Sequence, residues 1–195
     1  MGRKLAEELG LHFYDDEILK MASEKSAVGE EFFRLADEKA GNNLLHRLTG
    51  AKKADVFGKP SLKGDVTSPD NLVLKFQAMV MRELAEQEPC VFVGRAAGYV
   101  LDQDEEIENL IRIFVYADRV RRVQRVMEVD CISEERAKKR IRKIENERKN
   151  YYKYFTGNDW KNMKNYDLPI NTTRLGLDET AELIKEYVKL RGYMK

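Results

Sequence analysis

Arg148 occupies a position where an apolar side chain would be expected. A helix is predicted over 133–155, and its apolar stripe follows the 3.6-residue period through Ala137, Ile141, Ile144, Tyr151 and Phe155. At 100° per residue, position 148 falls in the middle of this stripe. A guanidinium there needs an anionic partner, because an unpaired buried charge is costly. That partner is either a ligand phosphate across a cleft, gripped by the bidentate fork, or an acid such as Glu145; simple snorkelling is the third alternative.

Arg140 is the second candidate on the same helix. It falls about 60° from the centre of the stripe, whereas Arg142 points away from it. This phase predicts a phosphate contact for Arg140 and a surface position for Arg142.

Two adjacent acids, Asp15 and Asp16, follow a short predicted strand over 11–14 and open a helix. One could point into a cleft, where it would hold Mg²⁺ through water or accept a proton from a substrate hydroxyl. Stabilisation of the helix N-terminus explains the same pair of residues equally well. Both interpretations stay open.

Gly94 and Arg95 follow a second short strand, the apolar run 90–93. Glycine lets the backbone approach a ligand closely, and Arg95 would lie at the carboxyl end of the strand. The pattern favours a ligand-binding arginine over a surface salt bridge.

Strands alternate with helices along the chain, which predicts an α/β fold built on a parallel sheet with helices on both faces. Further strands are expected over 110–116 and near 168–170, with helices over 2–9, 69–88 and from about 178. Residues 29–48 are predicted to be helical in two pieces, and 49–68 to form a long loop. Ligands bind beyond the carboxyl ends of parallel strands. Those ends carry Asp15/Asp16, Gly94/Arg95, Ala117/Asp118 and Asn171/Thr172.

The charge is unevenly distributed. The net charge is +1, but residues 119–164 contain 15 Lys and Arg against 7 Asp and Glu, which gives this segment +8 and leaves −7 for the remainder. Such a segment either faces phosphates or nucleic acid or forms a solvated helix face. No apolar run approaches the roughly 18 residues of a membrane span, and no secretory signal is present, so a cytoplasmic protein without membrane contacts is expected. The two cysteines and two histidines have no metal-type spacing.

These features together resemble the cytidylate kinase-like family, a branch of the P-loop nucleoside-monophosphate kinases. The likeness covers nearly the whole chain and follows the family's order. It is carried by the stretch from Gly2 to Gly10 with Phe13-Tyr14-Asp15-Asp16, by Phe92-Val93-Gly94-Arg95-Ala96-Ala97, by Ile113-Phe114-Val115-Tyr116-Ala117-Asp118, and by Glu145-x-x-Arg148, Tyr151-Tyr152, Tyr166-Asp167-Leu168 and Asn171-Thr172-Thr173.

The resemblance implies a three-layer P-loop kinase-like fold in one domain over 1–195. It would contain a five-stranded parallel sheet, a helical acceptor-binding insertion at about 20–88 and a basic helical lid at about 119–164. The implied reaction transfers the γ-phosphate of ATP, with Mg²⁺, to a nucleoside monophosphate such as CMP or dCMP.

The family's functional positions carry over to particular residues of this chain. Asp15 would lie near the acceptor and the metal, with Asp16 and Gly94 beside it, and Arg95 would hold the acceptor phosphate. Arg148 and Arg140 would stabilise charge on the transferred group. The ATP contacts would be Arg122, Arg125, Asn171 and Thr172. Converging arginines suit phosphoryl transfer, which depends mainly on positioning and electrostatic stabilisation.

Three departures from the family pattern matter. The position after Gly-Arg, where cytidylate kinases usually have an Asp that helps recognise cytosine, is Ala96, so the acceptor base is open. The arginine expected four residues before the lid acid is replaced by Ile141. No G-x-x-x-x-G-K-[ST] loop occurs, although the family has one just before the helix 2–9, preceded by the sheet's central strand. The expectation is that the native protein carries about 15–20 more residues containing this loop, or that the chain as given is inactive.

Three classes of function remain: a nucleotide kinase, a non-catalytic nucleotide-sensing or interaction protein of the same fold, and a nucleic-acid binder that uses 119–164. The kinase is favoured, and a nucleic-acid partner is not expected. The kinase assignment would fail if Arg95, Arg122 and Arg148 were scattered over unrelated surfaces with no shared cavity.

Overall fold

The computed structural model describes residues 1–26, 29, 31 and 69–193. In chain order the elements are α1 (Gly2–Leu9), β1 (His12–Tyr14), α2 (Glu17–Ser26), α4 (Pro69–Gln87), β2 (Cys90–Phe92), α5 (Ala97–Asp102), β3 (Ile113–Tyr116), α6 (Arg119–Asp130), α7 (Glu134–Thr156), the short 3₁₀ helix η2 (Met163–Asn165), β4 (Leu168–Asn171) and α8 (Thr172–Leu190). The predicted helical pieces in 29–48 and the predicted loop 49–68 lie almost wholly outside the described residues.

The strands form two separate parallel pairs. His12 of β1 is in register with Cys90 of β2, and Ile113 of β3 is in register with Leu168 of β4. The α/β class and the parallel pairing are therefore confirmed. Among the described residues β2 and β3 do not pair with each other, so the four strands do not form a single sheet.

Each strand pair has its own apolar core. The core beside β1 and β2 lies between α2, α4 and α5, and its most deeply buried side chains include Ile18, Met81 and Val100. The core beside β3 and β4 is formed with α1 and α8 and includes Leu5 and Ile184. Burying one such aliphatic side chain contributes about 1.5–3 kcal/mol. Each half of the molecule is thus held by its own helices.

The ends of the helices follow local sequence signals. Gly10 ends α1 in the left-handed conformation, as predicted, with φ of 65°. Ser133 begins α7 by accepting a hydrogen bond from the backbone N–H of Arg136. The last helix begins earlier than the predicted position near 178, because the Asn171 side chain caps it at Thr173, and Gly176 then interrupts its regular geometry.

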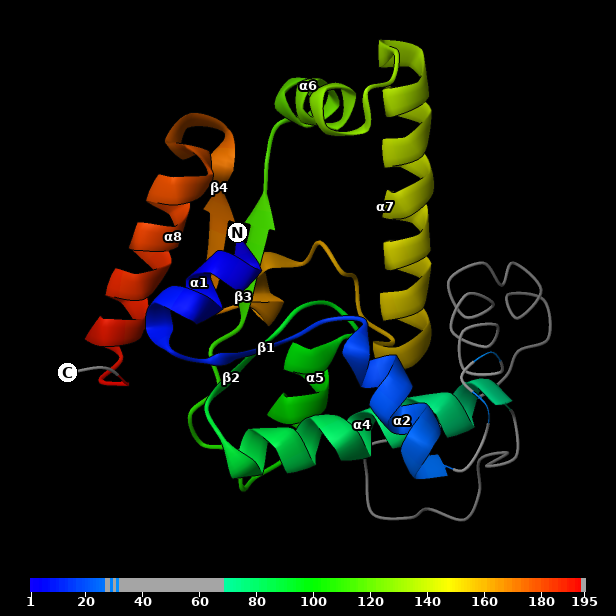
Figure 1. The fold of residues 1–195 in the computed structure, drawn as a ribbon, viewed down its shortest axis with the longest axis vertical. Coiled ribbons are helices and arrows are strands. Elements are labelled where there is room, and N and C mark those ends of the chain that lie inside the picture. Colours follow the sequence, from blue (N-terminus) through cyan, green and yellow to red (C-terminus); the bar gives the residue numbers. More distant parts are fainter. Residues whose placement is uncertain (27–28, 30, 32–68, 194–195) are drawn as a thin grey trace.

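Most of the basic 119–164 segment lies in α6 and α7: α6 lies beyond the end of β3, and α7 runs from there toward α4 at the opposite end of the molecule (Figure 1). The far end of α7 reaches α4, where Phe155 packs with Leu74. No helix in the described part of the chain combines the length and apolar character needed to cross a bilayer.

Candidate functional site

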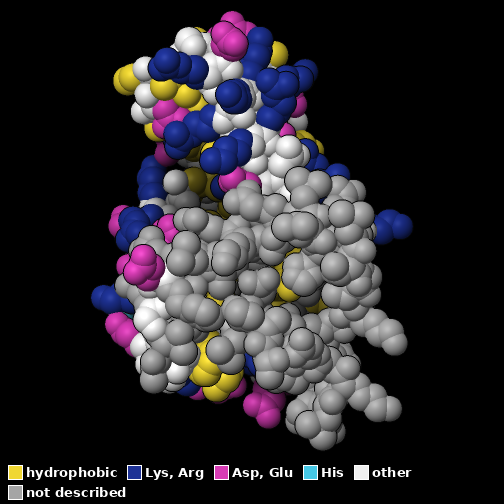
Figure 2. All heavy atoms as spheres, turned by 90° about the vertical axis from the view of Figure 1, so that its right-hand side faces the viewer, with side chains coloured by type: hydrophobic (Ala, Val, Ile, Leu, Met, Phe, Trp, Pro, Cys, Tyr) yellow, Lys and Arg dark blue, Asp and Glu magenta, His cyan; other side chains and the backbone are white. Residues whose placement is uncertain are grey.

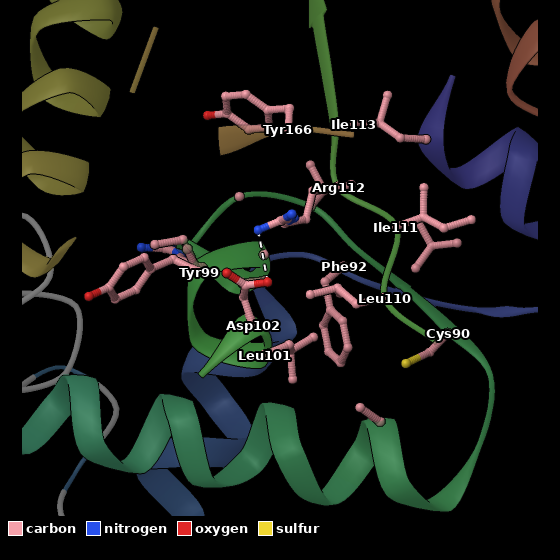
Figure 3. Close-up of a pocket in the computed structure, with 18 of the residues that line it drawn as sticks. Cys90, Phe92, Tyr99, Leu101, Asp102, Leu110, Ile111, Arg112, Ile113 and Tyr166 are labelled. Carbon is pink, nitrogen blue, oxygen red and sulfur yellow. Dashed lines mark ion pairs between the residues drawn. The ribbon is translucent and has the colours of Figure 1, made fainter. Parts of the chain in front are cut away.

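A large open cleft lies between the two strand pairs. Its volume is about 2220 Å³, which exceeds the roughly 300–1,000 Å³ of common ligand pockets. Figure 3 shows part of its lining, where Cys90 and Phe92 from β2 face the segment that carries Ile111 and Ile113 into β3.

Charged side chains from three separate elements line the same cleft. Asp15 and Asp16 come from the turn after β1, Gly94 and Arg95 from the turn after β2, and Arg148 from α7. These five residues were predicted as site residues from the sequence, and the fold brings them to one cavity.

The turn after β2 has an unusual backbone. Gly94, Arg95 and Ala96 are all left-handed, with φ values of 82°, 51° and 54°. Left-handed backbone costs a residue with a side chain about 1–2 kcal/mol. The conformation is followed by a hydrogen bond from the Ala97 N–H to the Gly94 carbonyl, which begins α5. Such costs are tolerated where the surrounding fold imposes them, and they concentrate at functional sites.

This turn directs Arg95 toward the end of β1. An Arg95 Nη2 proton is donated to Asp16 Oδ1 over 3.0 Å, and the Arg95 side chain is only 19% exposed, whereas that of Asp16 is 86% exposed. The two strand ends of the first pair are therefore linked by a charged hydrogen bond at the cleft, and an arriving phosphate could exchange with the exposed carboxylate.

Asp15 has a different environment from Asp16. Its Oδ1 accepts the backbone N–H of Asp16 at 2.7 Å, and its Oδ2 lies 3.8 Å from Arg3, whose guanidinium stacks on Phe13. The backbone carbonyls of Asp15 and Asp16, not their side chains, accept from the first N–H groups of α2. Capping thus involves the main chain, and the carboxylates remain at the cleft.

Arg148 is an exposed residue on the cleft-facing side of α7, beside Lys143 and Glu147. Within the described residues it forms no ion pair. The acid proposed as an alternative partner, Glu145, is engaged by Arg122 and Lys161 instead. The predicted stripe is real, with Ala137 and Phe155 buried, but at position 148 it opens onto the cavity.

The other five predicted site residues do not line the cleft. Arg140 pairs with Asp130 at 3.0 Å, Arg122 pairs with Glu145 at 2.8 Å, and Arg125 is exposed on α6. Asn171 and Thr172 lie at the end of β4. The expectation that Arg122 shares a cavity with Arg95 and Arg148 is therefore not met: Arg122 pairs with Glu145 of α7, and neither of these two residues lines the cleft.

The ends of the second strand pair are bonded to each other. Asn171 donates to Asp118 Oδ1 at 3.2 Å, the Asp118 N–H donates to Thr173 Oγ1 at 2.7 Å, and Thr172 donates to the Tyr116 carbonyl at 3.2 Å. The strand-end residues thus form two groups, one for each strand pair. The residues at the ends of β1 and β2 line the cleft, and those at the ends of β3 and β4 contact one another beside it.

Arg112 is a residue of the cleft that the sequence did not single out. It reaches from the start of β3 to Asp102 of α5 at 2.8 Å (Figure 3). It also contacts Asp167 at 3.2 Å, and so links α5 of the first half to the segment before β4 of the second. Burial acts to raise the pKa of Asp167, but the hydrogen bonds and charge of Arg112 outweigh it and lower that pKa. The sequence did contain a signal for this role, because Arg112 is a charged residue within the otherwise apolar strand predicted over 110–116.

Cationic side chains gather over α6 and α7, in the upper part of the face seen in Figure 2. Several are matched with acids, including Lys138 with Glu134 and Lys143 with Glu147. The surface is basic, but these acids neutralise part of its positive charge.

The carboxylates at the cleft suit Mg²⁺ only in combination with a phosphate ligand. Among the described residues no group of three or more acidic, His or Cys side chains could enclose a metal. Mg²⁺ is usually held by one or two carboxylates together with substrate phosphates and waters. Asp15 and Asp16 fit that arrangement.

The chain is similar to known proteins along nearly its whole length. It is 26% identical over 194 residues to a cytidylate kinase of Methanopyrus kandleri, which covers 95% of this chain and 83% of that protein. A crystal structure of an uncharacterized protein from Eubacterium ventriosum has the same fold, with a TM-score of 0.65 and 23% identity over 96% of this chain and 88% of the other. The family model described as the cytidylate kinase-like family matches residues 1–174. Because that model covers most of the chain, the chain belongs to the cytidylate kinase-like family.

Proposed function

We propose that this protein is a nucleoside-monophosphate kinase that transfers the γ-phosphate of ATP to a CMP- or dCMP-like acceptor. The observation that carries the proposal is that Arg95, from the turn after β2, and Arg148, from α7, line one cleft together with Asp15 and Asp16. Two guanidinium groups facing one cavity suit a reaction in which negative charge is spread over several phosphate oxygens.

Each cleft residue has a proposed role. Arg95 binds the acceptor phosphate, which replaces the Asp16 carboxylate at its guanidinium group. Arg148 stabilises the charge that develops on the transferred group. Asp15 is oriented by the Asp16 N–H and by Arg3, and it accepts a hydrogen bond from the acceptor or from metal-bound water. Mg²⁺, when bound, neutralises charge on the phosphate oxygens.

The proposed contacts of ATP lie at the ends of β3 and β4. They are Arg122 and Arg125 on α6, and Asn171 and Thr172 where β4 passes into α8. Arg140 on α7 is proposed, with Arg148, to stabilise charge on the transferred group. Arg122 holds Glu145 through Nη1 alone, so a phosphate would bind the N–H groups that Glu145 leaves unused, whereas at Arg140 it would have to replace Asp130.

Acceptor choice depends on Ala96, which lines the cleft directly after Arg95. Its methyl group can neither donate nor accept a hydrogen bond, so it cannot contribute to recognition of a base edge as an Asp could. We expect weak discrimination between cytosine and uracil monophosphates.

The test is a coupled assay of ADP formation on the protein purified at its native length, with Mg²⁺, ATP and a panel of CMP, dCMP, UMP, AMP and GMP. The proposal requires transfer to at least one pyrimidine monophosphate above the ATPase background. Binding of an ATP analogue and a monophosphate without ADP formation would instead support a non-catalytic nucleotide-sensing protein of the same fold.

A nucleic-acid partner is tested in the same preparation. The basic surface over α6 and α7 would have to give binding to DNA or RNA that falls steeply with salt, as counterion release demands. Because acids neutralise part of this surface, we expect no such binding.

A further inference from the structure

Glu145 lies where three segments of the chain meet. Its Oε1 atom accepts hydrogen bonds from Arg122 Nη1 at 2.8 Å and from Lys161 Nζ at 2.9 Å. Arg122 belongs to the first turn of α6, directly after β3, and Lys161 lies between α7 and β4. One carboxylate oxygen thus fastens the middle of α7 to the chain on both sides of it.

The contact between Glu145 and Arg122 is partly shielded from solvent. The Glu145 side chain is 27% exposed and that of Arg122 is 30% exposed, so water screens the pair only in part. The hydrogen bond from Arg122, aided by Lys161, outweighs burial and lowers the pKa of Glu145 to about 2. Within the described residues Arg122 Nε is buried without an acceptor, so this atom does not compensate for loss of the Glu145 contact. Removing the Glu145 charge would leave a partly buried cation unmatched.

Glu145 and Arg148 are neighbours on the surface of α7. Residues three apart lie about 60° apart around a helix axis and on adjacent turns. Whatever sets the rotation of α7 at Glu145 therefore also sets the direction of Arg148. For a side chain about 5–6 Å from the axis, a rotation of about 10° moves it by about 1 Å, and a misplacement of that size can cost about a hundredfold in rate.

We propose that Glu145 is a positioning residue, which together with Arg122 and Lys161 holds α7 in the rotation that points Arg148 into the cleft. The inference rests on the proposed phosphoryl transfer for the role of Arg148, but its structural part stands independently of that reaction. It assigns to Lys161 a part that no pattern in the sequence indicated.

The test compares two changes at the contact with two matched changes elsewhere on α7. Glu145→Gln removes the charge and keeps the shape, and Lys161→Met removes one donor from an exposed position. The controls are Glu134→Gln and Lys138→Met, which make the same substitutions in an exposed i,i+4 ion pair in the first turns of α7, away from the cleft. Each variant is assayed at native length for kcat and KM, and hydrogen exchange is followed over residues 142–150 and 157–162.

We expect Glu145→Gln to lower kcat by about tenfold to a hundredfold while KM changes less than about threefold, because a misdirected Arg148 loses an interaction made in the transition state. Lys161→Met has a smaller effect of the same kind, and Glu145→Asp recovers part of the loss. Both contact variants exchange amide hydrogen faster in the two segments, and the controls match the unmodified protein.

Each other outcome decides between the two proposals. Normal kcat and exchange in Glu145→Gln, in an active protein, would overturn the positioning role and leave the kinase assignment intact. A higher kcat would also overturn it, since Glu145 would then restrain the enzyme. If the unmodified protein transfers no phosphate, the kinase assignment fails. The exchange data then decide the positioning role alone: faster exchange supports it, and exchange equal to the controls refutes it.

Discussion

Replacing Arg148 with Met is expected to reduce phosphoryl transfer strongly while leaving the fold intact. A hydrogen bond to a charged group contributes about 1.5–3 kcal/mol, and each 1.36 kcal/mol corresponds to about tenfold in rate. Loss of this contact in the transition state should thus lower kcat by about 10- to 150-fold. Because Arg148 is exposed and has no ion pair within the described residues, the free energy of unfolding should change by no more than about 0.5 kcal/mol.

The matched control is Lys149→Met, at the neighbouring exposed position that does not line the cleft. It removes the same charge from the same helix and should leave kcat unchanged. Coupled assays at saturating ATP and acceptor give kcat, and urea titrations give the free energy of unfolding. Two results refute the reasoning: an Arg148→Met protein that retains full turnover, or one that unfolds, since the second would mean that Arg148 holds the structure together.

Three further predictions concern the cleft and its supports. Arg112→Met removes the only described partner linking Asp102 to Asp167, and it should lower the free energy of unfolding in urea by about 1–3 kcal/mol; an unchanged midpoint would show that the two halves do not need this link. The pKa of Glu145 is lowered from 4.5 to about 2, so its contribution to stability is complete above pH 4.5 and is lost as the pH falls toward 2. The stability difference between the unmodified protein and Glu145→Gln should therefore shrink over that interval, and a constant difference would contradict the contact. Ala96→Asp should raise the preference for CMP over UMP in kcat/KM, because a carboxylate can accept from the cytosine amino group; an unchanged ratio would place the base elsewhere.

Local signals account for what the sequence predicted well about the fold. Gly10 ends α1 and Ser133 begins α7 through contacts with their immediate neighbours, in agreement with the helices predicted over 2–9 and 133–155. The misplaced start of α8 involves signals of the same kind: Asn171 is a capping residue and Gly176 a break, so the helix begins before that break. The division of the strands into two pairs could not be predicted, because strand partners are set by the tertiary fold and not by the strand sequences.

The same distinction between local signals and tertiary packing applies to the residues of the candidate site. Asp16 and Arg95 were predictable because the ends of parallel strands converge, and these strands do pair. Arg122 was expected at the cleft, but the pairing of its guanidinium with Glu145 depends on how α6 packs on α7. Lys161 was missed for the same reason: it lies in an irregular segment where no periodic pattern indicates direction. The charge of a residue and its position relative to the strands identify it as a candidate site residue, whereas its contact partners depend on how the helices and strands pack.

The central claim is that Arg95 and Arg148 hold phosphate groups in one cleft. The most direct measurement is a crystal structure of the protein, at native length, with a bisubstrate analogue that joins adenosine and cytidine through a chain of phosphates. The account predicts phosphate oxygens within about 2.7–3.2 Å of both guanidinium groups, with the Asp16 carboxylate displaced from Arg95. Phosphates bound outside the cleft, or in contact with neither arginine, would contradict it.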